Sequence, residues 1–169
     1  LNLEELELIK EATTRNPACN LVLGFNRRFA PLVSEMKLRI RQIQQPKNIV
    51  ITVNSGQIAK DHWTQQMDIG GGRIIGEACH FIDLARFLVG APISKGAIMS
   101  QGVPDQFGTT QDKAMVSLAF ADGSIASIQY LASGHKSFPK ERVEVFTSGR
   151  VLQMNNYLSL RSWGFPGAS

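Results

Sequence analysis

Apolar side chains recur at helical spacing in three stretches of the first half of the chain. These stretches are residues 3–14, 31–45 and 72–89. A repeat of three or four residues is typical of a helix that packs one face against a core. Pro17 and Pro46 follow the first two stretches and Gly90 follows the third, so each predicted helix has a terminating residue near its end. The pattern therefore predicts three amphipathic helices.

The segments between and after these helices have the patterns of β-strands. Short apolar runs at residues 21–23 and 47–54 indicate buried strands, and apolar residues alternate with others from 114 to 120. Further candidate strands cover residues 93–100, 124–132, 142–147, 151–155 and 157–163. The dipeptide Asp122-Gly123 predicts a type I′ hairpin, and Ser148-Gly149 predicts a second tight turn. Because hairpins join antiparallel strands, we predict an α+β fold, with a largely antiparallel mixed sheet and helices on one face.

The predicted sheet has a second face that no helix covers. Its expected side chains are small or mildly polar, among them Ser117, Ala119, Ser127 and Gln129. Such a flat surface suits a homo-oligomer in which two sheets pack together. Ordinary exposure to solvent explains the same residues equally well.

Composition and charge narrow the class of protein. The 169 residues are 43% hydrophobic and 19% charged, which is typical of a globular chain with one sizeable core. The 18 basic and 14 acidic residues are scattered, so no basic stripe favours nucleic acid. Cys19 and Cys79 form no Cys-x-x-Cys pair, which favours a reducing compartment, and no apolar run is long enough to span a membrane. We therefore expect a cytoplasmic protein that binds neither nucleic acid nor membrane.

A triple glycine precedes three polar residues that carry candidate chemistry. Glu77, His80 and Asp83 recur every three residues and thus share one stripe of the third predicted helix. The opposite stripe is expected to enter the core and comprises Ile75, Ala78, Ile82, Ala85 and Val89. The polar stripe is then left to face solvent or a cleft. In a cleft it could move protons, because histidine titrates near neutral pH.

The loop before this helix, residues 55–72, is longer than most connections in compact domains. It carries His62 and Trp63, and the indole could either cover a ligand or anchor the loop. A metal site at Glu77 and His80 is a weaker alternative, because no His-Glu-x-x-His or paired Cys-x-x-Cys spacing occurs. We therefore predict no metal.

Two separated motifs resemble those of one known family. They are Gly24-Phe25-Asn26-Arg27-Arg28-Phe29-Ala30-Pro31 and, after a Trp-bearing loop, Gly-Gly-Gly followed by His80, Asp83-Leu84, Arg86, Leu88 and Gly90. In this order and spacing, the chain resembles the glucose-fructose oxidoreductase, inositol dehydrogenase and MocA (Gfo/Idh/MocA) family over nearly its whole length. The resemblance implies an N-terminal Rossmann domain that binds NAD or NADP, and a C-terminal α+β domain whose sheet commonly mediates oligomerisation.

The resemblance also implies an activity and roles for particular residues. The expected reaction is hydride transfer between nicotinamide and a hydroxyl or carbonyl carbon, often of a sugar, cyclitol or related polyol. His80 matches the family's histidine and is the expected catalytic acid and base. The expected substrate-binding residues are Glu77, Arg73 and Trp63, and the expected cofactor contacts are Asn26 and Arg27. The family usually has an Asp where this chain has Gly76, so Glu77 is expected to substitute for it.

Two further family motifs do not occur in this sequence. They are the Glu-Lys-Pro segment with the catalytic lysine and the Gly-x-Gly-x-x-Gly loop that cradles a pyrophosphate. A lone helix and strand also lack the neighbours that a parallel sheet requires. We therefore expect residues 1–24 to be the last helix and strand of a truncated Rossmann domain, residues 25–169 to be the substrate and oligomerisation domain, and the chain alone to be inactive. A non-catalytic oligomerisation or ligand-sensing domain is the alternative.

Overall fold

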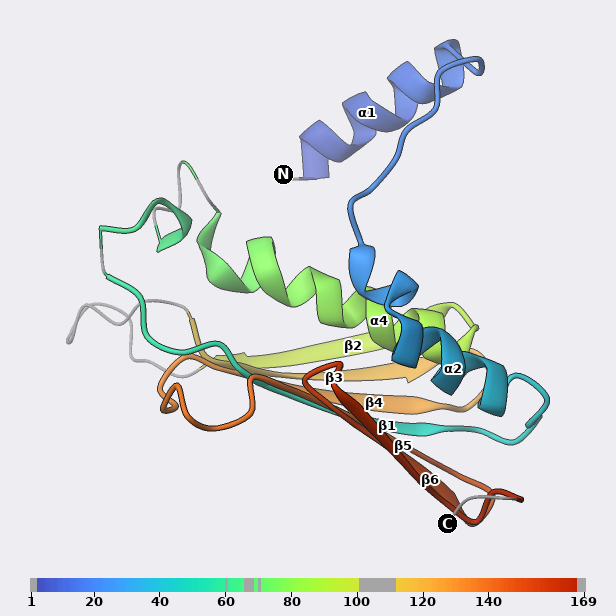
Figure 1. Ribbon diagram of the computed structural model, residues 1–169. Coiled ribbons are helices and arrows are strands. Elements are labelled where there is room, and N and C mark those ends of the chain that lie inside the picture. Colours follow the sequence, from blue (N-terminus) through green and yellow to red (C-terminus); the bar gives the residue numbers. More distant parts are fainter. Residues whose placement is uncertain (1–2, 60, 66–68, 70, 101–111, 167–169) are drawn as a thin grey trace.

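A computed structural model describes residues 3–59, 61–65, 69, 71–100 and 112–166 of the chain (Figure 1). The elements follow one another as α1 (Leu3–Arg15), η1 (Asn26–Phe29), α2 (Pro31–Ile40), β1 (Asn48–Asn54), η2 (Trp63–Gln65), η3 (Ile74–Ala78), α4 (Cys79–Val89), β2 (Ile93–Ser100), β3 (Ala114–Phe120), β4 (Ile125–Leu131), β5 (Glu141–Thr147), β6 (Arg150–Asn155) and β7 (Ser159–Trp163). Here η1 and η2 are short 3-10 helices and η3 is π-helical.

The strands form one sheet in the order β2-β3-β4-β1-β5-β6-β7. The strand β1 pairs in parallel with β4, where Ile51 lies opposite Ile128, and antiparallel with β5. The remaining neighbouring pairs are antiparallel. Figure 1 shows α2 and α4 on the same side of this sheet. The predicted α+β fold, with a largely antiparallel mixed sheet and helices on one face, is therefore confirmed.

The two predicted hairpins form, but one has a different turn from the predicted one. Ser148 and Gly149 both have positive φ, 50° and 70°, as a type I′ turn requires. At the β3–β4 connection only Gly123 has positive φ, so the predicted type I′ turn is wrong there. The reason is local, since the Asp122 carboxylate accepts hydrogen bonds from the backbone N–H and the hydroxyl of Ser124.

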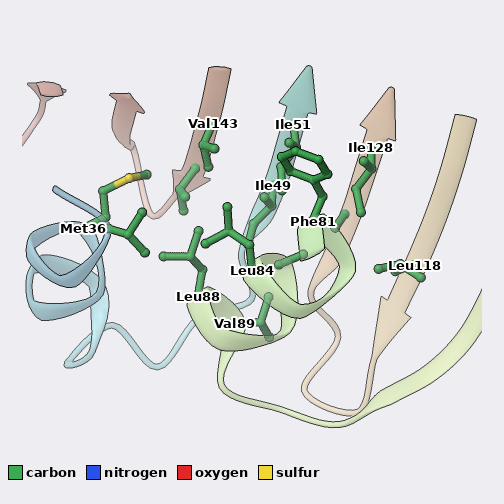
Figure 2. Packing of buried hydrophobic residues seen from close by; sticks show 14 of the residues in the cluster. Met36, Ile49, Ile51, Phe81, Leu84, Leu88, Val89, Leu118, Ile128 and Val143 are labelled. Carbon is green, nitrogen blue, oxygen red and sulfur yellow. The ribbon is translucent and has the colours of Figure 1, made fainter. Parts of the chain in front are cut away.

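The core lies between α4, α2 and the inner face of the sheet. Figure 2 shows Leu84 and Leu88 of α4 pointing toward the strands, with Met36 of α2 beside them. These three side chains are fully buried, as are Ile51 and Ile128 on the sheet. Every second residue of β1, β3 and β4 is buried, because alternate residues of a strand face this layer. Burial of this layer is what holds α4, and with it the candidate site, against the sheet.

The first 24 residues do not share this core. Helix α1 forms as predicted, yet none of its residues is buried, and Figure 1 shows it standing away from the sheet. The predicted strand at 21–23 is wrong, because Leu21, Val22 and Leu23 are 58%, 84% and 63% exposed and lie in no strand. An extended segment becomes a strand only when a neighbour takes up its backbone hydrogen bonds. The second helix also ends early, at Ile40 rather than Gln45, where the chain turns to enter β1.

Candidate active site

The polar end of α4 begins with a turn that is wider than an α-helical one. Gly71 and Gly72 have φ of 68° and 78°, a region that glycine adopts at little cost. The chain then passes through the π-helical segment η3 before it continues as α4. Bonding from residue i to i+5 adds a residue to the turn. Side chains of η3 are therefore rotated relative to those that follow Cys79.

This rotation changes which stripe of the helix enters the core. The residues that are fully buried here are Ala78, Phe81, Leu84, Ala85 and Leu88, with Val89 nearly so. Ile75 was expected in the core and is 56% exposed, and Ile82 is only half-buried. Ile82 still packs against the core, so the predicted stripe is wrong only at Ile75, because it assumed an unbroken period of 3.6 residues across η3.

The three polar residues do not form one shared stripe either. Glu77 turns toward β4, Asp83 is buried against η1, and His80 lies between them. Asp83 accepts hydrogen bonds from the Arg28 guanidinium, whose carbon lies 5.3 Å from the centroid of the Phe87 ring. Asp83 therefore ties η1 to α4.

Two side chains donate hydrogen bonds to Glu77, one from four residues earlier in the chain and one from a distant strand. The Tyr130 hydroxyl, on β4, donates a hydrogen bond to Glu77 Oε2, and Arg73 donates from Nε and Nη2 at 3.3 and 3.4 Å. Burial alone would raise the pKa of Glu77, but these hydrogen bonds and the charges of Arg73 and Lys140 outweigh it and hold that pKa below its ordinary value. The carboxylate is thus ionised while its side chain remains 41% exposed.

A second cluster of the same three residue types lies at the start of β5. Both carboxylate oxygens of Glu141 accept hydrogen bonds from Arg27, Oε2 from Nε at 3.1 Å and Oε1 from Nη2 at 2.9 Å. The Tyr157 hydroxyl also donates to Oε2, at 2.7 Å. Tyr157 has a positive φ of 56°, which is uncommon for a residue with a side chain. The Arg27 guanidinium also lies 4.3 Å from the centroid of the Phe81 ring. This cluster ties the segment after α1 to both α4 and the sheet.

His80 lies among these charged groups and beside an aromatic ring. The Phe25 ring packs edge-on against the imidazole, with centroids 5.4 Å apart and planes at 88°. Burial and the charge of Arg27 lower the pKa of His80, and the carboxylates of Asp83, Glu141 and Glu77 only partly offset them. Atom Nδ1 is buried and has no hydrogen-bond partner among the described residues. The imidazole is therefore neutral near pH 7, as an acid and base for a hydroxyl proton requires.

The remaining predicted site residues are placed as follows. Arg73 is 3% exposed, and it also donates to the backbone oxygens of Gly56 and Ser55. Asn26 and Arg27 line a hollow of about 270 Å³ with Ala30, Glu141 and Tyr157. Trp63 is 59% exposed, and its ring centroid lies 6.0 Å from that of His62.

Within the ranges that the structure describes, no three His, Cys, Asp or Glu side chains gather closely enough to hold a metal ion. No helix among the same residues has the length and apolarity that crossing a membrane requires.

Comparison with known proteins places the chain in a family. Residues 41–152 match the GFO/IDH/MocA C-terminal domain. The chain belongs to the Gfo/Idh/MocA family. The expectation drawn from the two motifs is therefore confirmed. Over 152 residues this Gfo/Idh/MocA chain is 27% identical to the uncharacterized oxidoreductase YrbE of Bacillus subtilis, covering 86% of the chain and 43% of YrbE.

Solved structures share the fold of this Gfo/Idh/MocA chain. The WlbA dehydrogenase from Bordetella pertussis, solved in complex with NADH and UDP-GlcNAcA, has a TM-score of 0.78 and 15% identity, with 98% of this chain and 53% of WlbA covered. The UDP-N-acetylglucosamine 3-dehydrogenase GnnA from Acidithiobacillus ferrooxidans has a TM-score of 0.73 and 18% identity, with 100% and 52% covered. The chain thus spans about half the length of the relatives that it matches.

The tertiary structure brings to the candidate site four residues to which the sequence assigned no role. They are Phe25, Tyr130, Glu141 and Tyr157. The sequence could have predicted a role for Tyr130, because it occupies an inward-facing position of β4 and a buried hydroxyl there needs a hydrogen-bond partner. The other three are brought in by contacts between elements distant in sequence, which a local pattern does not show.

Proposed function

We propose that the chain is the C-terminal part of an NAD(P)-dependent oxidoreductase that acts on a sugar, cyclitol or related polyol by hydride transfer. In this proposal, residues 1–24 complete a Rossmann domain that lies elsewhere in the protein, and residues 25–169 supply the substrate side of the site. The apolar side chains of Leu21, Val22 and Leu23, all exposed here, support a covering domain. The observation that carries the proposal is the setting of His80, a neutral imidazole at the polar end of α4 with the ionised Glu77 nearby.

His80 is the proposed acid and base. Because Nδ1 is buried, Nε2 is the ring nitrogen left to take the proton of a substrate hydroxyl. A bound nicotinamide would supply the hydride acceptor for the carbon that bears this hydroxyl, so that loss of the proton to His80 and of the hydride would convert the alcohol to a carbonyl. In the reverse direction, protonated His80 returns the proton to the carbonyl oxygen. Glu77 accepts a hydrogen bond from a hydroxyl of the substrate and thereby orients it.

Only the edge of this chain near Asn26 is proposed to contact the cofactor. Arg27 is occupied by Glu141, so its proposed contribution is to fix the wall of the hollow beside Asn26. Asn26 is exposed and retains an amide that can contact the nicotinamide half of the cofactor. Trp63, also exposed, is proposed to cover the substrate. The known binding of NADH by WlbA supports a nicotinamide cofactor, whereas the choice between NAD and NADP rests with the other domain.

The first test reads the coding sequence upstream of Leu1. A Rossmann domain that ends in Glu-Lys-Pro supports the proposal, and a start codon at that point favours the non-catalytic alternative. The complete protein is then assayed with NAD⁺ and NADP⁺ against a panel of sugars and polyols. His80→Gln should lower kcat by about 10²-fold or more with cofactor Kd unchanged, because general acid and base catalysis typically contributes that much. His135→Gln, on an exposed loop, is the matched control.

We also propose that the outer face of the sheet forms a homo-oligomer. Small side chains lie opposite one another across its strands, in the row Ala97, Ser117, Ser127 and Val50. They line a shallow groove of about 410 Å³ that exposed Ile125 borders. Ser127→Arg should convert the oligomer to monomer in analytical ultracentrifugation. Ser34→Arg, on exposed α2 surface, should leave the mass unchanged, and a monomeric wild-type chain would refute the proposed interface.

A further inference from the structure

Two Tyr–Glu–Arg clusters contribute to the charge around His80, and they differ in their exposure. The side chain of Glu141 is 7% exposed, whereas that of Glu77 is 41% exposed. Each glutamate accepts a hydrogen bond from one tyrosine, and the chain contains only these two tyrosines. The Glu141 cluster is closed and structural. The Glu77 cluster presents its carboxylate toward solvent at the polar end of α4.

We propose that Tyr130 is a positioning residue, whose hydroxyl acts with Arg73 to hold Glu77 as a fixed anion that accepts a hydrogen bond from a neutral hydroxyl of the substrate. This inference rests on the proposed function for the identity of the ligand. It assigns a role to Tyr130, which the sequence motifs do not include. Tyr130 and Arg73 are both buried and therefore act through Glu77. In this inference Arg73, which the family resemblance implied to bind the substrate, does not touch it.

The geometry fixes Glu77 from two sides. Oε2 accepts from Tyr130 and from Arg73 Nη2, and Oε1 accepts from Arg73 Nε. Arg73 is itself anchored, because its Nη1 donates to Gly56 O at 2.8 Å and its carbon lies 5.6 Å from the centroid of the Tyr130 ring. The guanidinium thus lies between the loop after β1 and the helix. Neither donor can follow Glu77 if its side chain rotates away, so the observed rotamer is favoured.

In this arrangement Glu77 can still accept one hydrogen bond from a ligand. A carboxylate has about four acceptor sites, and the contacts above use three, so Oε1 retains one. An ionised carboxylate accepts a hydrogen bond from a hydroxyl and repels a carboxylate or phosphate placed at the same point. The subsite beside Glu77 therefore selects a neutral hydroxyl, whatever charged groups the rest of a substrate carries.

The test is an NMR titration of the glutamate carboxyl carbons in the ¹³C-labelled 169-residue chain. Tyr130→Phe removes one hydroxyl and keeps the buried ring, so the fold should persist, which the amide spectrum verifies. We expect the titration midpoint of Glu77, assigned with Glu77→Gln, to rise by about one pH unit in Tyr130→Phe. Tyr157→Phe removes the equivalent hydroxyl from the other cluster and is the matched control, with the Glu77 midpoint unchanged.

Two results would overturn the inference. One is a Glu77 midpoint that does not move in Tyr130→Phe, and the other is an equal movement in both tyrosine variants, which would indicate general loosening. If Tyr130→Phe does not fold, the phenol of Tyr130 is titrated instead, in the wild-type chain and in Glu77→Gln. The hydrogen bond and the charge of Glu77 raise the pKa of Tyr130, so that pKa should fall in Glu77→Gln. An unchanged Tyr130 pKa there also counts against the role of Tyr130. Since the titration needs no substrate, an inactive complete protein would refute the proposed function and leave this result standing.

Discussion

Glu141→Gln tests whether the closed Tyr–Glu–Arg cluster holds the segment after α1 onto the domain. Glu141 accepts side-chain hydrogen bonds from Arg27 at 3.1 and 2.9 Å and from Tyr157 at 2.7 Å. The glutamine amide keeps one acceptor oxygen and turns an NH₂ group toward a donor. It also leaves the Arg27 guanidinium without its counter-charge at a place where its side chain is only 22% exposed.

The size of the effect follows from this burial. Removing one partner of a buried ion pair costs about 3–5 kcal/mol. Because Arg27 keeps some access to water, we expect the lower end, about 3 kcal/mol in the free energy of unfolding. The matched control is Glu35→Gln, in the exposed pair of Glu35 with Arg39, where the side chains are 43% and 35% exposed. An exposed helical pair contributes about 0.3–0.5 kcal/mol.

The assay is urea unfolding of the chain, followed by circular dichroism. The double variant Arg27→Met with Glu141→Gln should cost less than the two single variants added together, since each single change leaves one partner uncompensated. If Glu141→Gln costs no more than Glu35→Gln, or if the two single effects simply add, the pair does not stabilise the domain and the reasoning is wrong.

Three further predictions concern pH and packing. The pKa of His80 lies below its ordinary 6.5 in the folded chain, so the unfolded chain binds the proton first and stability should fall as the pH drops through 6.5. His80→Gln should flatten this dependence in urea unfolding. Gly134→Ala puts a Cβ 1.9 Å from Asn54 Oδ1 and should cost about 1–3 kcal/mol, whereas Gly24→Ala, with no atom within 4 Å, should cost under about 0.5. Leu84→Ala, fully buried, should cost about 3 kcal/mol, and a cost below about 1 would show that α4 is not packed as described.

Much of the fold is encoded in local pattern. Helix α1, the start of α2 and the residues of α4 follow from spacing, and the hairpin at Ser148-Gly149 follows from two residues that tolerate positive φ. The alternation in β3 correctly identified its inward-facing residues. These features depend on neighbours within a few residues of one another, so a single sequence predicts them well.

Other features depend on contacts that no local pattern contains. The strand at 21–23 has the right composition and no partner, so it does not form. The π-helical turn of η3 shifts the register of Glu77 relative to His80 and Asp83, which both lie in α4, whereas a uniform period had placed all three on one stripe.

For the candidate site, too, the sequence predicted some features and the tertiary structure decided the others. The sequence predicted a role for His80 because it matches the histidine of the family motif, and for Glu77 because it lies next to the position where the family usually has Asp and this chain has Gly76. Their environment came from tertiary structure alone, since Tyr130 is 53 residues from Glu77 and Glu141 is 114 residues from Arg27. Whether a carboxylate is ionised, or an imidazole neutral, is set by burial and by neighbouring charges. Those quantities exist only once the chain has folded.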